Sequence, residues 1–218
     1  MTTQSKLKDD VAAPVNGYQR RRLETRRQLL QAGRALFVEK AVEQVSIESI
    51  TERAGVAKGS FYNHFESREA LFDEVIGLAI EELLAKYAAF DPPTEDPLVR
   101  ARERGRFVFC TLLSDPATCR LLLQGGQPLQ GGAIDRVMRM VLGDTLAIGL
   151  SMGSLSHLDP EIVYAAYFGV VTQTIAHLLT CEDDIDVAAA ADEVTALCFA
   201  VLGLAPYMPP AGQGEQVA

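Results

Sequence analysis

The sequence is poor in the residue types that build metal and redox centres. It has three histidines and four cysteines in 218 residues, and these form neither a CxxC pair nor a recognisable metal-binding pattern. Metal centres need clusters of such ligands, so we expect no metal ion and no cofactor. The thiols are interpreted as buried and reduced, and a redox-sensing role is the alternative.

Catalytic signatures are missing as well. The chain has no GxSxG, HExxH, Walker or GxGxxG motif. Its only glycine-dense stretch, GGQPLQGG at 125–132, lacks the lysine and the following hydroxyl residue of a phosphate-binding loop. We therefore interpret this stretch as a loop and expect no enzymatic activity.

Long hydrophobic runs are rare. Residues 162–181 carry no charged side chain, but Thr172, Gln173, Thr174 and His177 interrupt the run and no cation flanks it. A membrane span would be purely apolar with cationic anchors, so this segment is predicted to be a buried helix. The polar first sixteen residues lack the apolar core of a signal peptide, and we expect a cytoplasmic protein without a membrane partner.

Positive charge is scarce overall but concentrated at one end. The chain holds 29 Asp and Glu against 20 Lys and Arg, yet residues 1–70 hold 12 of the basic and only 9 of the acidic residues. Six arginines lie between positions 20 and 34. A basic head on an acidic body fits a protein that contacts phosphates at one end, and a solvated helix face is the alternative for the arginine run.

The hydrophobic pattern is helical throughout, and we find no alternating strand pattern. Helices are predicted at about 23–40, 47–54, 57–64, 67–89, 97–113, 116–124, 133–152, 160–181 and 187–204. The predicted fold class is therefore all-α, with nine helices. We expect a flexible basic arm (1–22), a helix-turn-helix domain (23–70), a larger helical domain (71–205) and a flexible tail (206–218).

The segment 46–65 has the pattern of two short helices joined at a glycine. Ser46 is suited to cap the first helix, and Gly55 follows its last turn, where a left-handed residue is needed. Phe61 and Phe65 share one face of the second helix, and the opposite face carries Lys58, Ser60, Tyr62, Asn63 and His64. A helix with an apolar anchor and such an outer face fits the DNA major groove. The alternative is an ordinary three-helix head with a polar surface.

Two stretches, GVAKGSFYNHF at 55–65 and SREALF at 67–72, resemble the DNA-binding signature of the tetracycline-repressor (TetR) family. The resemblance runs from about Thr25 to Leu78, with Glu66 as its one departure. It implies a homodimer that binds double-stranded DNA at a palindromic operator through the second helix. It also implies a helical ligand-binding and dimerisation domain, and release by a small apolar or amphipathic effector.

Residue chemistry and the resemblance together indicate the DNA contacts. Basic, hydroxyl and amide groups near helix N-termini bind phosphates and base edges. The predicted contacts are Arg20, Arg21, Arg22, Ser46, Lys58, Gly59, Ser60, Tyr62, Asn63, His64 and Arg68. An effector that tilts the helix at 67–89 would change the spacing of two such heads.

The larger domain carries the remaining predictions. The helix after Pro160 is apolar all round, which favours burial between its own chain and a partner copy; the alternative is an intrachain core. The predicted dimer residues are Val163, Val170, Leu178, Val194 and Val201, and the predicted effector-binding residues are Phe107, Cys110, Met138, Tyr164, Phe168 and His177. The alternative for the latter set is core packing, with His177 hydrogen-bonded inside. An effector-independent DNA-binding module controlled by a protein partner is the alternative function.

Overall fold

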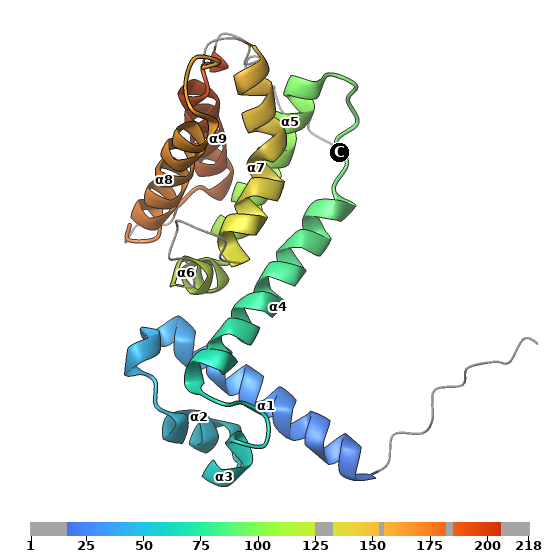
Figure 1. Ribbon diagram of the computed structural model, residues 1–218, viewed down its shortest axis with the longest axis vertical. Helices are drawn as coiled ribbons and strands as arrows, with labels where there is room; N and C mark the ends of the chain where they lie inside the picture. Colours follow the sequence, from blue (N-terminus) through green and yellow to red (C-terminus); the bar gives the residue numbers. More distant parts are fainter. Residues whose placement is uncertain (1–16, 125–132, 153–154, 182–184, 206–218) are drawn as a thin grey trace, which may run out of the picture.

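The computed structural model describes residues 17–124, 133–152, 155–181 and 185–205. The α-helices are α1 (Gly17–Glu39), α2 (Ile47–Ala54), α3 (Lys58–Phe61), α4 (Arg68–Ala89), α5 (Pro97–Leu113), α6 (Pro116–Gln124), α7 (Ala133–Ser151), α8 (Pro160–Leu178) and α9 (Val187–Val201), and a 3-10 turn, η1 (Val42–Gln44), follows α1 (Figure 1). The described residues form no strand, and the predicted all-α class with nine helices is confirmed for them.

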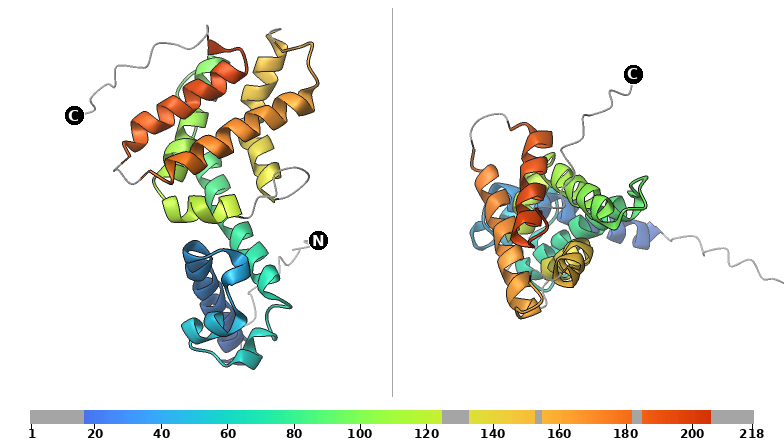
Figure 2. Two further views of the ribbon diagram at one scale, coloured as in Figure 1. Left: turned by 90° about the vertical axis from the view of Figure 1, so that its left-hand side faces the viewer. Right: turned by 90° about the horizontal axis from the view of Figure 1, so that it is seen from above.

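The helices form a small head and a larger body. Helices α1, α2 and α3 lie together at one end, α5 to α9 lie at the other, and α4 runs from the head into the body (Figure 1). Helices α8 and α9 pack side by side on one flank of the body (Figure 2). Helix α4 therefore belongs to both parts and connects them directly.

Short polar residues determine where most helices begin. Six helices start at a side chain that accepts a hydrogen bond from a first-turn backbone N–H: Ser46, Ser67, Asp96, Asp115, Asp159 and Asp186. Each cap satisfies donors that the helix itself leaves unpaired. A proline occupies the first position of α5 and of α8, where its missing N–H costs nothing.

The core of the head joins all four of its helices. Leu29 and Phe37 of α1, Ile50 of α2, Phe61 of α3 and Leu71 of α4 are fully buried together. Helices α1 and α4 approach so closely that a Cβ atom on Gly33 would lie 2.8 Å from the Leu71 side chain. Burial of this apolar surface is what stabilises a domain of this size, so the orientation of α4 is tightly coupled to that of α1.

Two predicted boundaries differ from the structure. Helix α1 begins at Gly17, so the expected flexible arm is wrong for residues 17–22. Good helix formers fill most of these positions and no proline interrupts them, so the helix extends although no side chain there is buried. Helix α3 ends at Phe61, and residues 62–64 continue as hydrogen-bonded turns. Residues 1–16, 125–132 and 206–218, predicted as arm, loop and tail, lie outside the described residues.

Candidate nucleic-acid interface

Helices α2 and α3 form a helix-turn-helix unit at the tip of the head. Ser46 Oγ accepts a 3.0 Å hydrogen bond from the Ser49 amide, which confirms the predicted cap. Gly55 ends α2 in the left-handed conformation, with φ of 67°, as its position suggested. Phe61 and Phe65 are both buried in the head, and their ring centroids lie 5.7 Å apart. The anchor of the second helix is therefore the predicted one.

The opposite face of the second helix is open. Lys58, Gly59 and Asn63 are exposed, Ser60 is half-buried, and Tyr62 exposes 57% of its surface. The Tyr62 ring lies edge-on to Phe61, with centroids 5.5 Å apart, so the packed core orients an exposed phenol. A Cβ atom on Gly59 would meet nothing within 4 Å, so the fold of this chain does not require glycine there.

His64 connects the helix-turn-helix unit with the start of α1. Burial lowers the pKa of His64, and the positive charges of Arg22 and Arg26 lower it further. The two arginines are therefore near enough to His64 to act on it electrostatically. The fold therefore brings Arg22 near the helix-turn-helix unit, although 42 positions separate it from His64.

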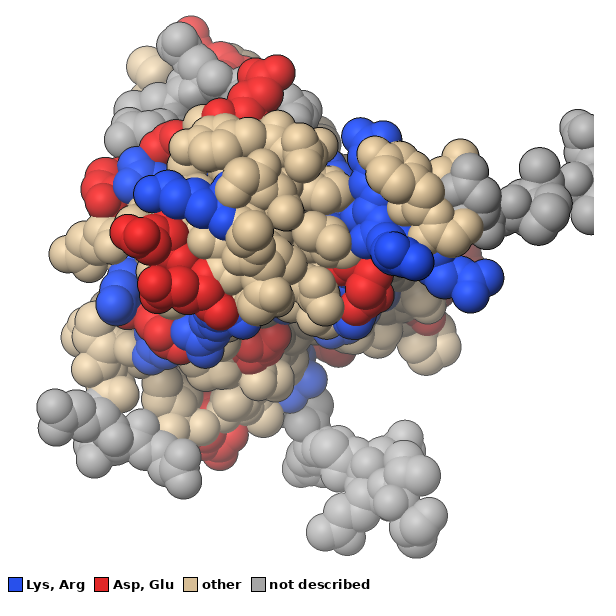
Figure 3. All heavy atoms as spheres, turned by 90° about the horizontal axis from the view of Figure 1, so that it is seen from below, with Lys and Arg blue, Asp and Glu red and all other residues tan. Residues whose placement is uncertain are grey.

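The charged surface of the head surrounds an uncharged centre. Seen from below, uncharged side chains occupy the middle of this end of the molecule, Lys and Arg lie on both sides of them, and Asp and Glu lie next to these cations, most of them on the left (Figure 3). Arg20, Arg21 and Arg22 are exposed on the first turns of α1. An uncharged reading face with cationic flanks suits a groove bordered by two phosphate backbones.

Two arginines of the head are already engaged within the chain. Arg68 donates hydrogen bonds to the carbonyl oxygens of Glu43 and Val45, at 3.1 and 3.0 Å, and pairs with the Glu69 carboxylate. Its guanidinium thus ties η1 to α4, and a phosphate contact for Arg68 stays a prediction. Arg26 pairs with Glu74 of α4 through two hydrogen bonds and lies over the Phe65 ring. Sequence reasoning missed this Arg26–Glu74 pair, because its partners are far apart in the chain.

An apolar cavity of about 50 Å³ lies in the body. Its walls come from five helices: Ile80 and Leu83 of α4, Leu112 of α5, Cys119, Leu122 and Leu123 of α6, Met138 of α7, and Val171, Thr172 and Ile175 of α8. Met138 is the one predicted effector-binding residue among them.

The other predicted effector-binding residues do not converge on this cavity. Phe107 stacks on Phe90 at 4.2 Å, and Cys110 is half-buried beside Arg106. Tyr164 and Phe168 are core residues, and the Tyr164 hydroxyl donates a 2.8 Å hydrogen bond to Asp135. His177 is exposed on the last turn of α8, so the interpretation that it is hydrogen-bonded inside the core is wrong.

The predicted dimer residues divide into two groups. Val163 and Val194 are buried within the single chain, so they cannot present a surface to a partner. Val170, Leu178 and Val201 are half-buried. The large apolar side chains exposed on α8 and α9 are Ile162, at 67%, and Leu197, at 41%. When a helix is apolar on every side, its sequence does not show which side packs against a neighbouring helix of the same chain and which side remains exposed.

The cysteines are reduced but not uniformly buried. Cys119 and Cys198 are buried, and burial raises the pKa of each thiol to about 12, which keeps both protonated at neutral pH. Cys181 is exposed, which corrects the prediction that all four thiols are buried. Within the described residues, no group of three potential ligands stands close enough to hold a metal ion. Nor does any described helix combine the length and apolarity needed to cross a membrane.

A capped helix, a left-handed glycine turn and a second helix with a polar outer face form a helix-turn-helix unit, a motif typical of DNA-binding proteins. Residues 29–75 match the family model of bacterial regulatory proteins of the tetR family. The amino-terminal part of the chain is therefore similar to the DNA-binding domain of the TetR family.

Curated relatives share this part of the chain. The HTH-type transcriptional repressor KstR2 of Mycobacterium tuberculosis (strain H37Rv) is 33% identical over 92 residues, which are 42% of each chain. The HTH-type transcriptional repressor BepR of Brucella suis is 38% identical over 73 residues, covering 32% of this chain and 35% of that one. The matched part spans less than half the length of these relatives.

Solved structures share the fold over more of the chain. A tetR-family transcription regulator from Shewanella sp. PV-4 has a TM-score of 0.64 at 20% identity, covering 81% of this chain and 96% of that one. NalD of Pseudomonas aeruginosa, a secondary repressor of the MexAB-OprM multidrug efflux pump, has a TM-score of 0.56 at 20% identity, covering 84% and 97%. At this identity the likeness concerns the fold alone, and it includes the body as well as the head.

Proposed function

We propose that this protein is a transcriptional regulator, a repressor that binds an inverted-repeat operator as a homodimer and is released by a small molecule. The observation that carries the proposal is the exposed surface of Lys58 on α3 and of Tyr62 and Asn63 in the turns after it, anchored by buried Phe61 and Phe65. Its relatives by sequence are named as repressors. We propose no catalytic activity and no cofactor for it.

In this proposal α3 enters the major groove. Lys58 reaches a phosphate or a guanine edge, Tyr62 gives its hydroxyl to phosphate and its ring to a thymine methyl, and Asn63 reads adenine or binds phosphate. Ser46, Gly59, Ser60 and His64 border the same surface. The arginines at the start of α1 follow the adjacent backbone, where their charge adds affinity without sequence preference.

The proposed dimer forms through α8 and α9. Ile162 and Leu197 are large apolar side chains exposed on these two helices, and half-buried Val170, Leu178 and Val201 lie on the same elements. Exposed apolar surface of this kind on neighbouring helices favours a self-complementary contact around a two-fold axis. Two linked heads then read two half-sites, and linkage raises the affinity above that of one head.

The proposed release mechanism depends on the apolar cavity between α4 and α8. At about 50 Å³ it is far smaller than the ~300–1,000 Å³ of usual ligand pockets, so an effector must push its walls apart. Ile80 and Leu83 of those walls belong to α4, which carries the head. The change in operator affinity is limited by how much better the effector binds the displaced arrangement.

The test is selection of binding sites from a random DNA pool with the purified full chain, followed by gel-shift titration. We expect enrichment of an inverted repeat, with tight binding to the whole repeat and weak binding to a half-site. Enrichment of no sequence, or equal affinity for whole and half-sites, would contradict the proposal. Effector release is tested separately by thermal-shift screening, because a ligand that binds only the folded state raises its melting temperature.

A further inference from the structure

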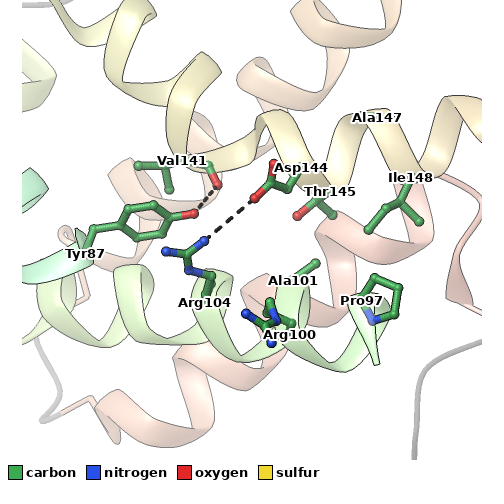
Figure 4. Close-up of a pocket in the computed structure, with 10 residues that line it drawn as sticks. All are labelled: Tyr87, Pro97, Arg100, Ala101, Arg104, Val141, Asp144, Thr145, Ala147 and Ile148. Atoms are coloured by element: carbon green, nitrogen blue, oxygen red, sulfur yellow. Dashed lines mark hydrogen bonds and ion pairs between the residues drawn. The ribbon is translucent and has the colours of Figure 1, made fainter. Parts of the chain in front are cut away.

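A second cavity, of about 290 Å³, opens between α4, α5 and α7 (Figure 4). One part of its wall is apolar and consists of Pro97, Ala101, Val141, Ala147 and Ile148. The other part carries Tyr87, Arg100, Arg104, Asp144 and Thr145. This volume lies near the lower end of the range for small-molecule pockets, roughly 300–1,000 Å³. The cavity therefore suits a small molecule with an apolar body and one polar end.

Arg104 is a cation whose hydrogen-bonding capacity is largely unused. Its side chain is only 25% exposed, and its nearest acidic partner, Asp144, lies at 3.8 Å, beyond hydrogen-bond distance. Its Nε atom is buried and has no hydrogen-bond partner among the described residues. The guanidinium lies 4.5 Å from the centre of the Tyr87 ring. A guanidinium offers five N–H donors, and leaving a buried donor unpaired is costly, so this group favours an acceptor that the chain does not supply.

Thr145 adds an unused hydroxyl on the same side. In α5, α8 and α9, Thr111, Thr172 and Thr195 each donate to the carbonyl oxygen four residues earlier. Thr145 is only 4% exposed, yet no such bond is formed by its hydroxyl within the described part of the chain. Figure 4 shows its oxygen on the side of Asp144 and Arg104. The oxygen itself is not fully enclosed, and Thr145 lines the cavity, so its hydroxyl is available to a ligand atom.

The neighbouring charges favour an anion over a cation. Arg100 is already satisfied, because it donates to Asp91 at 3.2 Å and to the Thr94 carbonyl at 2.6 Å. Asp144 has a side chain that is 71% exposed, so it can turn into solvent at little cost. Arg104 cannot leave its place in the same way. The positive charge of Arg104 would repel a cationic ligand. A carboxylate, in contrast, would match the planar donors of Arg104 in a bidentate geometry.

We propose that this cavity binds a small carboxylic acid with an apolar body, held by Arg104 and Thr145. The carboxylate accepts two hydrogen bonds from Arg104 and one from the Thr145 hydroxyl, and it displaces Asp144. The hydrocarbon part lies against Ala101, Val141 and Ile148. Tyr87 of α4 forms part of the wall and donates to the Val141 carbonyl at 3.4 Å, so the ligand touches the helix that carries the head. Binding of the carboxylic acid does not depend on DNA. Only the expected effect of the bound ligand on operator affinity rests on the proposed function.

The test uses the full chain without DNA, in calorimetric titrations and thermal-shift measurements. The probes are hexanoate and benzoate, each compared with its primary amide and with hexylamine. We expect the two carboxylates to bind and to raise the melting temperature, and the amides and the amine to do neither. Binding of an amide or of the amine as tight as that of its carboxylate counterpart would overturn the proposal.

Four variants make the assignment specific. Arg104→Gln should weaken carboxylate binding roughly tenfold or more, and Thr145→Val should weaken it several-fold. Asp144→Asn should strengthen it, because the competing carboxylate is gone. The matched control is Arg120→Gln, since the exposed Arg120 guanidinium donates to the Leu179 carbonyl away from the cavity. The proposal would be overturned if a folded Arg104→Gln variant bound carboxylates like the parent, or if Asp144→Asn bound them more weakly. If Arg104→Gln does not fold, the binding measured for Thr145→Val and Asp144→Asn decides the question. Operator affinity, measured separately, tests the proposed function alone.

Discussion

Arg34 of α1 donates a 2.8 Å hydrogen bond to the hydroxyl of Thr118 on α6, and this bond joins the head to the body. A second bond runs the other way, from the Gln124 amide of α6 to the Phe37 carbonyl of α1, at 3.0 Å. Helix α6 also supplies three of the residues that line the apolar cavity. The head is therefore held to the proposed effector-binding part of the body by α6 as well as by α4.

We expect Thr118→Val to lower the free energy of unfolding by about 0.5–1.5 kcal/mol, because it leaves the Arg34 donor unpaired. Urea unfolding of Thr118→Val, Arg34→Gln and the double variant measures the coupling between the two side chains. Thr180→Val is the control, since that hydroxyl bonds only within its own turn. Strictly additive effects of the two substitutions would show that the bond contributes nothing.

Lys58→Ala and Tyr62→Ala should each weaken operator binding by about 1–3 kcal/mol without changing the fold, because both side chains are exposed. Tyr62→Phe keeps the edge-on packing against Phe61 and separates the role of the hydroxyl from that of the ring. Gel-shift titration measures the affinities, with Lys40→Ala as an exposed control directly after α1. Parent-like binding by both alanine variants would mean that α3 is not the reading helix.

Replacing Arg20, Arg21 and Arg22 by glutamine should weaken binding to all DNA sequences similarly. The slope of log affinity against log salt should become shallower by about one unit for each phosphate that the arginines no longer neutralise. Glutamine keeps the helix propensity of these positions, which matters because they belong to α1. Arg27→Gln is the control, since Arg27 already pairs with Glu24. An unchanged slope would remove the start of α1 from the interface.

Stability should fall as the pH is lowered through the range in which histidine titrates in the unfolded chain. The pKa of His64 is lowered in the folded state from its ordinary 6.5, so the unfolded state binds this proton more readily. The contribution of His64 is therefore fully present above pH 6.5 and is lost as the pH falls towards the lowered folded pKa. Urea unfolding between about pH 5 and 8 should show a smaller pH dependence for His64→Gln than for the parent. Equal dependence in both would contradict the assignment to His64.

Ile162→Glu and Leu197→Glu should convert the dimer to monomers, because a charge buried in an apolar interface without a partner is strongly unfavourable. Both side chains are exposed in the single chain, so the fold of each subunit should survive. Light scattering after size exclusion measures the mass, and operator affinity should fall with it. Leu78→Glu, at an exposed apolar position on α4, is the control. If both variants remain dimers, the partner surface lies elsewhere.

Much of the head could be predicted from the sequence because its signals are local. Ser46 caps α2 and Gly55 ends it, as predicted. The burial of Phe61 and Phe65 follows from their four-residue spacing on a short helix. The extra turns of α1 were missed because residues 17–22 have no apolar stripe, and a helix formed by propensity alone leaves no hydrophobic pattern.

The sequence by itself determined the number of helices and those ends that a cap or a turn glycine marks, because spacing, caps and turn glycines act over one or two turns. The tertiary structure decided which side chains of each helix remain available. Val163 is buried while Ile162 beside it is exposed, and Arg100 is paired while Arg104 retains unpaired donors. Burial and pairing depend on helices that are distant in sequence, so no local pattern contains this information.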